Sequence, residues 1–170
     1  MLTHHTRLLT AAGTVAAAAA IALTGVTAAS AIPAGRPAGS GTEHVQVMST
    51  STTSGTASAI AHGLFTAAGT ARLGSARVGT ISFPRGTITL SHHAGKGTMH
   101  FSPRTCLAII SQPGTYKITG GTGKYAGITG HGTYQLNFTL IASRTAGKCS
   151  TAARPAAQQE LLRLSGTVHL

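Results

Sequence analysis

The stretch Gly114–Tyr134, GTYKITGGTGKYAGITGHGTY, is the most informative part of the chain. Alternating residues lie on both sides of a glycine cluster, a pattern that predicts two β-strands joined at a glycine-built corner. Glycine adopts positive φ or allows close backbone approach, and Tyr125 gives the corner an apolar plug. The structural glycines expected here are Gly120, Gly121, Gly123, Gly127, Gly130 and Gly132. The stretch therefore indicates a fold and does not by itself indicate a reaction.

The same two-residue period recurs along most of the chain after residue 43. Strands are expected within residues 44–48, 57–67, 77–83, 86–92, 98–102, 107–111, 115–119, 131–140 and 162–170. Short strands separated by glycine and proline turns predict an all-β domain, either a closed antiparallel β-barrel of about eight strands or a β-sandwich. A last strand able to pair with the first favours the barrel, because closure removes exposed edges. A helix is the alternative for residues 156–163, AAQQELLR, on propensity.

Two turns are expected from local composition. Residues 94–97, AGKG, predict a hairpin turn, and Pro113-Gly114 is a second turn signal. In the first hairpin His93 and His100 become diagonal neighbours on the polar face. Two histidines without a carboxylate make at best a loose metal site, so a solvated face is favoured and no metal is expected.

The beginning of the chain has the pattern of an export signal. Arg7 precedes an apolar run over residues 8–29, and Ala29-Ser30-Ala31 matches a small-x-small cleavage site. We therefore expect a secretory signal peptide at 1–31, a flexible Pro/Gly/Ser linker at 32–42 and the β-barrel domain at 43–170. An uncleaved membrane anchor is the alternative for the first segment, and no later segment is long and apolar enough to span a bilayer.

The chain is strongly basic. It has 13 Lys and Arg residues against two acids, Glu43 and Glu160, and a formal charge of +11; the part after residue 31 keeps +10. Such a surplus favours anionic partners, such as the polymers of a cell envelope. The cations are dispersed and the chain has no tryptophan, so a specific nucleic-acid interface is not expected.

Cys106 and Cys149 are the only cysteines. In an exported chain an even pair predicts a disulfide, because the compartment is oxidising. Closing the 42 intervening residues would restrict the unfolded chain by about 4 kcal/mol in the chain-entropy model.

The sequence GGTGKYAGITGHGTY resembles the glycine-rich element of dirigent and allene-oxide-cyclase-like β-barrels, closely over Gly114–Ala142 and loosely over 43–170. It also resembles a group of uncharacterised secreted proteins of high-GC Gram-positive bacteria, which have a comparable Thr-Cys-Leu segment before the motif. The resemblance implies an eight-stranded antiparallel barrel with an apolar interior. It carries no catalytic residue over, because dirigent-like proteins use aspartates that this chain lacks, and neither glutamate lies in a matching cyclase motif.

No motif in the sequence identifies a reaction. Gly121, Gly123 and Ala126 fit a relaxed dinucleotide fingerprint, but the βαβ unit and the acidic partner are missing, so no cofactor is expected. The leading hypothesis is a secreted, non-catalytic binding or envelope-associated protein. One alternative is a dirigent- or cyclase-like enzyme that guides an apolar substrate inside the barrel, and another is a polyanion-binding surface. Candidate residues for a pocket or barrel mouth are Tyr116, Tyr125, His131 and Tyr134.

Overall fold

The computed structural model describes residues 39–50, 55–73 and 77–170. The chain divides into two units, Met1–Ala34 and Gly35–Leu170, and the description concerns the second. The expected signal peptide and the expected linker up to residue 38 lie outside the described residues. The first strand begins at Ser40, so residues 40–42 belong to a strand and not to the linker.

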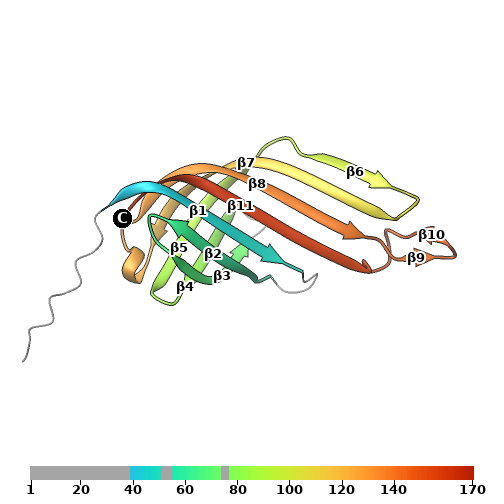
Figure 1. Ribbon diagram of the computed structural model, residues 1–170, viewed down its shortest axis with the longest axis horizontal. Helices are drawn as coiled ribbons and strands as arrows, with labels where there is room; N and C mark the ends of the chain where they lie inside the picture. Colours follow the sequence, from blue (N-terminus) through green and yellow to red (C-terminus); the bar gives the residue numbers. More distant parts are fainter. Residues whose placement is uncertain (1–38, 51–54, 74–76) are drawn as a thin grey trace, which may run out of the picture. The chain divides into compact units, whose positions relative to one another are not determined.

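Eight antiparallel strands close into a barrel (Figure 1). They are β1 (Ser40–Ser49), β2 (Ala57–Gly63), β3 (Ala67–Leu73), β4 (Val78–Phe83), β5 (Gly86–Ala94), β7 (Leu107–Gly121), β8 (Thr129–Ile141) and β11 (Ala157–His169). Their order is β5–β4–β3–β2–β1–β11–β8–β7, and β7 pairs again with β5. The predicted closed barrel of about eight strands is confirmed, including the pairing of the first strand with the last.

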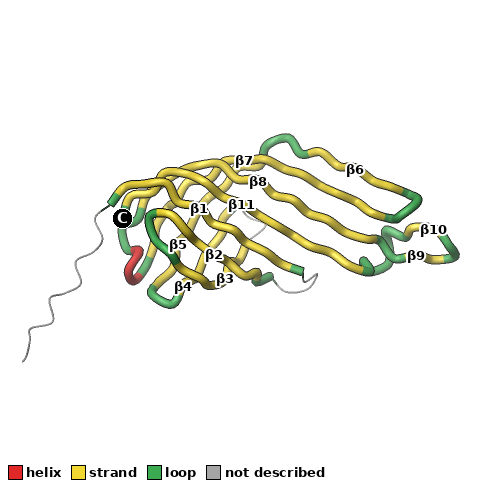
Figure 2. The backbone as a smooth tube through the Cα atoms, viewed as in Figure 1, coloured by secondary structure: helices red, strands yellow, loops and turns green. Residues whose placement is uncertain are grey.

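Part of the sheet continues beyond the barrel. Strand β6 (Thr98–Ser102) pairs with the first part of β7, whereas β5 pairs with the second part. The tube in Figure 2 shows β6, β7, β8 and β11 extending past the barrel as an open sheet. Short strands β9 (Arg144–Thr145) and β10 (Lys148–Cys149) form a ribbon after β8. The barrel therefore has one end that carries this extension and one that does not.

The predicted β5–β6 hairpin is wrong. Both strands pair with β7, at different parts of its length, so residues 94–97 lead from one part to the other. His93 is paired with Thr115 and His100 with Ile109, and they are not diagonal neighbours. The glycines at 95 and 97 do lie in the connection between two strands, but pairing with the long strand β7 decides the topology.

The predicted turn at Pro113-Gly114 is also wrong, because β7 runs through both residues. The Pro113 carbonyl accepts a hydrogen bond from Gly95 N at 2.8 Å, so this residue's backbone faces the side of β5 and β6. The β5 pairing reaches Gly114 and the β6 pairing reaches Ser111, which leaves residue 113 in the gap between them. A proline is tolerated there because no ladder bond needs its missing N–H.

The helical alternative for residues 156–163 is not realised. The segment belongs to β11, which pairs with β1 along one side and β8 along the other. Leu162, Leu164 and Val168 point into the barrel and are buried. Their two-residue spacing suits a strand between two partners, and this tertiary pairing outweighs local helix propensity.

Candidate functional site

The glycine corner closes one end of the barrel. Between β7 and β8 lies a single 3-10 turn, Gly123–Tyr125, and Gly123 and Gly127 have φ of +58° and +77°, values that favour glycine. The Tyr125 ring is 4% exposed and its centroid lies 5.1 Å from that of Phe65 and 5.6 Å from that of Phe83. These three aromatic rings plug the end of the barrel.

The corner is fastened to the β4–β5 turn. Lys124 N donates to Arg85 O at 2.8 Å, and Thr122 N donates to Thr87 O at 2.9 Å. The hydroxyl of Thr122 also accepts from Thr87 N at 3.0 Å. A Cβ on Gly123 would lie 2.2 Å from Arg85 O, so a side chain there would break this contact.

The remaining predicted glycines have different settings. Gly120 and Gly121 end β7, and a Cβ on Gly121 would lie 2.3 Å from Tyr125 O, whereas one on Gly120 would meet nothing within 4 Å. Gly130 and Gly132 belong to β8, where a Cβ would lie 2.6 Å and 2.2 Å from carbonyl oxygens of β11. These two residues allow β8 and β11 to approach closely.

The middle of the barrel is filled. The cavity beside Glu43 measures only about 20 Å³ and is lined by apolar side chains, Phe65 and Tyr116 among them. The Tyr116 hydroxyl lies over Gly166, where an added Cβ would be 2.7 Å from it. Gly132 and Gly166 lie between Tyr116 and Glu43 in the strand register, so the Tyr116 side chain extends along the inner wall toward that carboxylate.

Glu43 is a carboxylate inside this core. It is 3% exposed, its Oε2 accepts a hydrogen bond from Phe65 N at 3.1 Å, and its Oε1 is buried with no hydrogen-bond partner among the described residues. Burial raises the pKa of Glu43, and backbone hydrogen bonds from Phe65 and Leu64 oppose that shift. Burial, with the charge of Glu43 as a further cause, also raises the pKa of Tyr116.

The other end of the barrel opens into a cavity of about 150 Å³. Its wall is largely apolar, and five side chains with polar groups reach it from four strands: His92 of β5, Gln112 and Tyr116 of β7, Tyr134 of β8 and Glu160 of β11. We call this the mouth cavity; its full lining is Leu90, His92, Ala94, Gln112, Tyr116, Tyr134, Leu136, Glu160, Leu162 and Leu164.

Tyr134 is fixed at the mouth by two neighbours. Gly114 is its cross-strand partner, and a Cβ on Gly114 would lie 2.3 Å from the Tyr134 ring. The His92 ring meets Tyr134 edge-on, with centroids 6.0 Å apart. Burial raises the pKa of the Tyr134 hydroxyl, which keeps it a neutral hydrogen-bond donor at ordinary pH.

A second apolar hollow, of about 390 Å³, lies on the extension; we call it the extension cleft. One wall is the face of β6, β7 and β8 that carries Met99, Phe101, Ala108, Ile110 and Leu140, and Ala142 follows β8. The opposite wall comes from the loop after β10, through Ser150, Thr151, Ala153 and Pro155. Because alternate residues share a face, Tyr134, Leu136, Phe138 and Leu140 of β8 connect the mouth cavity to this cleft.

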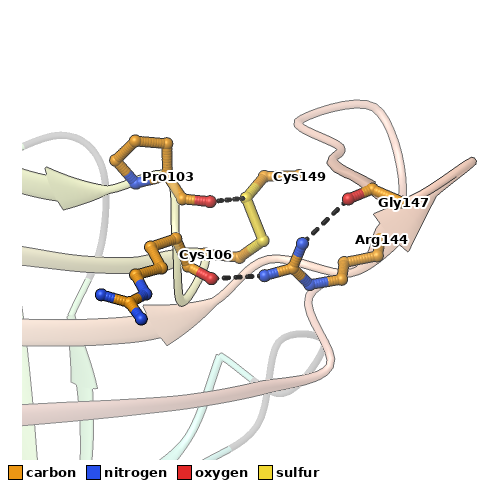
Figure 3. The surroundings of a disulfide bond; sticks show 6 residues. Pro103, Cys106, Arg144, Gly147 and Cys149 are labelled. Atoms are coloured by element: carbon orange, nitrogen blue, oxygen red, sulfur yellow. Dashed lines mark hydrogen bonds between the residues drawn. A yellow bond between two sulfur atoms is a disulfide. The ribbon is translucent and has the colours of Figure 1, made fainter.

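The predicted disulfide joins β10, which leads into this loop, to the turn between β6 and β7 (Figure 3). Cys106 and Cys149 have Cα atoms 5.4 Å apart, and Cys106 is buried just before β7. The Arg144 guanidinium donates to Arg104 O at 2.6 Å and to Gly147 O at 2.9 Å. Ser143 Oγ donates to Arg154 O at 2.7 Å. The bridge and these bonds hold the outer wall of the extension cleft.

The four residues predicted for a pocket or mouth lie in three places. Tyr116 and Tyr134 line the mouth cavity, Tyr125 plugs the closed end, and His131 is exposed on β8. Sequence reasoning missed His92, Gln112 and Glu160. The alternation of β11 could have placed Glu160 on the face of Leu162, but Gln112 reaches the mouth only because β7 continues through Pro113.

Neither a metal centre nor a spanning helix is found in the part of the chain that the structure describes. No group of three or more His, Cys, Asp or Glu side chains in residues 39–50, 55–73 and 77–170 could hold a metal ion. Over the same ranges, no helix is both long enough and apolar enough to cross a bilayer. The chain matches no protein-family model, no curated protein and no solved structure.

Proposed function

We propose that this protein is an exported, non-catalytic binding protein that takes a small apolar or amphiphilic molecule at the open end of its barrel. The observation that carries the proposal is the apolar face of β8, which leaves the filled barrel at Tyr134 and continues to the extension cleft. Leu136 at the mouth, and Phe138 and Leu140 beyond it, are only half buried. Such a concave apolar surface with few polar groups is typical of small-molecule sites.

The polar groups of the mouth suit one end of an amphiphile. His92, Gln112 and the Tyr134 hydroxyl offer donors and acceptors beside an otherwise apolar wall. A ligand with a polar end there and an apolar body along β8 would bury carbon surface worth about 25 cal/mol per Å². The ligand class is therefore an elongated molecule with one hydrogen-bonding end.

Binding is favoured over a cyclase-like reaction by the distribution of free space. The buried Glu43 faces a cavity of about 20 Å³, which holds no substrate-sized molecule. The only other acid, Glu160, lies at the mouth. A reaction guided inside the barrel would need space that the core side chains occupy.

Export is part of the proposal. The Cys106–Cys149 bridge is compatible with an oxidising compartment, where such bonds form and persist. The leader-like pattern of residues 1–31 supports the same assignment. Mass spectrometry of the protein secreted by its producing cell should show an N-terminus near residue 32.

Binding of a neutral fluorescent probe, N-phenyl-1-naphthylamine, tests the site. We expect saturable binding that is insensitive to salt, and an affinity at least about tenfold lower in Ile110→Gln and Leu136→Gln, because each places an amide in the apolar face. Ile109→Gln is the matched control, since Ile109 neighbours Ile110 but is exposed on the opposite face of β7.

Thermal unfolding of each variant shows whether it is folded. Absence of saturable probe binding by the wild-type protein would contradict the proposal. An equal loss of affinity in Ile109→Gln and Ile110→Gln would also contradict it, because the inner face would then have no special role.

A further inference from the structure

A large hollow lies on the outer wall of the barrel, separate from the mouth cavity. It has a volume of about 560 Å³ and crosses β2, β1, β11, β8 and β7. We call it the outer groove. Its outward-facing side chains carry polar groups on a surface that is largely carbon; they are His44, Gln46, His62, Thr133, Gln135, Arg163 and Ser165, with Pro113 at one end.

The strand register arranges these side chains in two rows across the sheet. In one row, Arg163 of β11 lies between Gln46 of β1 and Gln135 of β8. In the other row, His44 lies between His62 and Ser165. The rings of His44 and His62 are stacked with centroids 5.1 Å apart. Three nitrogen-bearing cationic or ionisable groups therefore converge from three neighbouring strands.

No carboxylate lines the groove, although the charge of Glu43 acts on His62 from the core side of the sheet. The chain has only two acids, and both point inward: Glu43 into the core and Glu160 into the mouth cavity. Arg163 is exposed, and among the described residues no hydrogen bond or ion pair holds its guanidinium, so it can bind an oxyanion in the bidentate geometry that arginine favours. The flanking Gln46 and Gln135 amides can both donate to and accept from hydroxyl groups.

From this arrangement we propose that the outer groove binds an acidic polysaccharide. A carboxylate or sulfate group of the polymer lies against Arg163, and sugar hydroxyls bond to the Gln46 and Gln135 amides. The groove runs across several strands, which suits a chain of sugars better than a single ion. It offers no exposed row of aromatic side chains on which nucleic-acid bases could stack, which favours a glycan over a nucleic acid.

The test uses polygalacturonate, a carboxylate glycan, and dextran as a neutral glycan. We expect saturable binding of polygalacturonate that weakens as salt rises from about 50 to 300 mM, since charge pairs on a surface are screened, and no measurable binding of dextran. Arg163→Gln should weaken polygalacturonate binding at least about tenfold. Arg72→Gln is the matched control, because it removes the same charge from exposed Arg72 on β3, outside the groove.

Equal weakening by the two arginine variants would overturn the proposal in favour of attraction by net charge alone. Tighter, Arg163-dependent binding of single-stranded DNA than of polygalacturonate would overturn it in favour of a nucleic-acid surface. Failure of the wild-type protein to bind polygalacturonate would also overturn it. The double variant His44→Gln/His62→Gln should weaken polygalacturonate binding as well, while its unfolding temperature stays unchanged. An unchanged affinity would show that the two imidazoles do not contact the polymer.

Discussion

Glu43 is the buried charged residue among those that the structure describes, and it is held with one oxygen unpartnered. A carboxylate in this position is stable as the neutral acid and costly as the anion. Its ionisation therefore links the stability of the barrel to pH.

Replacing Glu43 with glutamine should remove this link. The folded-state pKa of Glu43 is raised above its ordinary value of 4.5. The folded wild-type protein therefore has its full stability below pH 4.5 and loses stability as the pH rises through the raised pKa. Glu43→Gln should thus gain in relative stability with rising pH, by about 1–3 kcal/mol at pH 8, the cost of an unsatisfied buried group. Denaturant unfolding of both proteins at pH 4, 5, 6, 7 and 8 measures the difference.

The comparison at pH 4 is the internal control, since Glu43 is largely neutral there in both states. If the difference in unfolding free energy stays constant from pH 4 to pH 8, the pKa of Glu43 is the same in the folded and unfolded states, which would contradict the prediction. Salt at fixed concentration keeps the exposed cations equally screened throughout.

At the scale of the element, β7 shows how a proline fits a central strand. Pro113 lies between the residues of β7 that pair with β5 and those that pair with β6, so no ladder partner needs an N–H from it, and its carbonyl accepts from Gly95 N. A proline followed by a glycine predicts a turn. Only the points where β5 and β6 end show that β7 can continue through both residues.

Exchanging prolines along β7 tests this account. Pro113→Ala should change the unfolding free energy by less than about 1 kcal/mol, because its new N–H faces the gap. Thr115→Pro should cost about 3 kcal/mol or more, because residue 115 directs its N–H to the same side, toward its partner His93. Denaturant unfolding measures both. A large loss in Pro113→Ala together with a small one in Thr115→Pro would refute the interpretation.

How far the elements could be predicted depends on whether their signal is local. The alternation of Tyr134, Leu136 and Phe138 indicated β8 correctly, and the corner at Gly123 followed from glycines that only a tight bend needs. The pairing of β6 with β7 could not be found this way, because several strands of the chain have similar edges and the local sequence does not say which of them pair. For the same reason Tyr116 and Tyr134 could be named as candidates for a pocket or mouth from the sequence, whereas Gln112 could not.

At the scale of the whole molecule, polarity is sorted between two surfaces. Both acids face inward, whereas the Lys and Arg side chains of the described residues are exposed on the outside. The basic composition was evident from the sequence, but composition does not say which side of the sheet each side chain faces. The register across five strands is what gathers His44, His62 and Arg163 in one groove.

The disulfide stabilises the molecule without defining the barrel. It ties the start of β7 to β10 on the extension, whereas the core cluster and the β5–β7 closure involve other residues. Cys106→Ala/Cys149→Ala should lose up to about 4 kcal/mol of unfolding free energy, yet keep a strand-type far-ultraviolet circular dichroism spectrum at 25 °C. Loss of that spectrum would show that closure depends on the bridge. Free thiols in the denatured, non-reduced wild-type protein would show that the bridge is absent.

The position of the first and last described residues has a practical consequence. Leu170 N donates to Gly39 O at 2.9 Å, and a Cβ on Gly39 would contact Leu64, the neighbour of the plug residue Phe65. Both ends of the domain therefore leave from the plugged end of the barrel, near the corner (Figure 1). A tag or solid support joined after Leu170 would hold the domain by its sealed base, and the mouth and the extension would face outward, open to whatever the surrounding solution delivers.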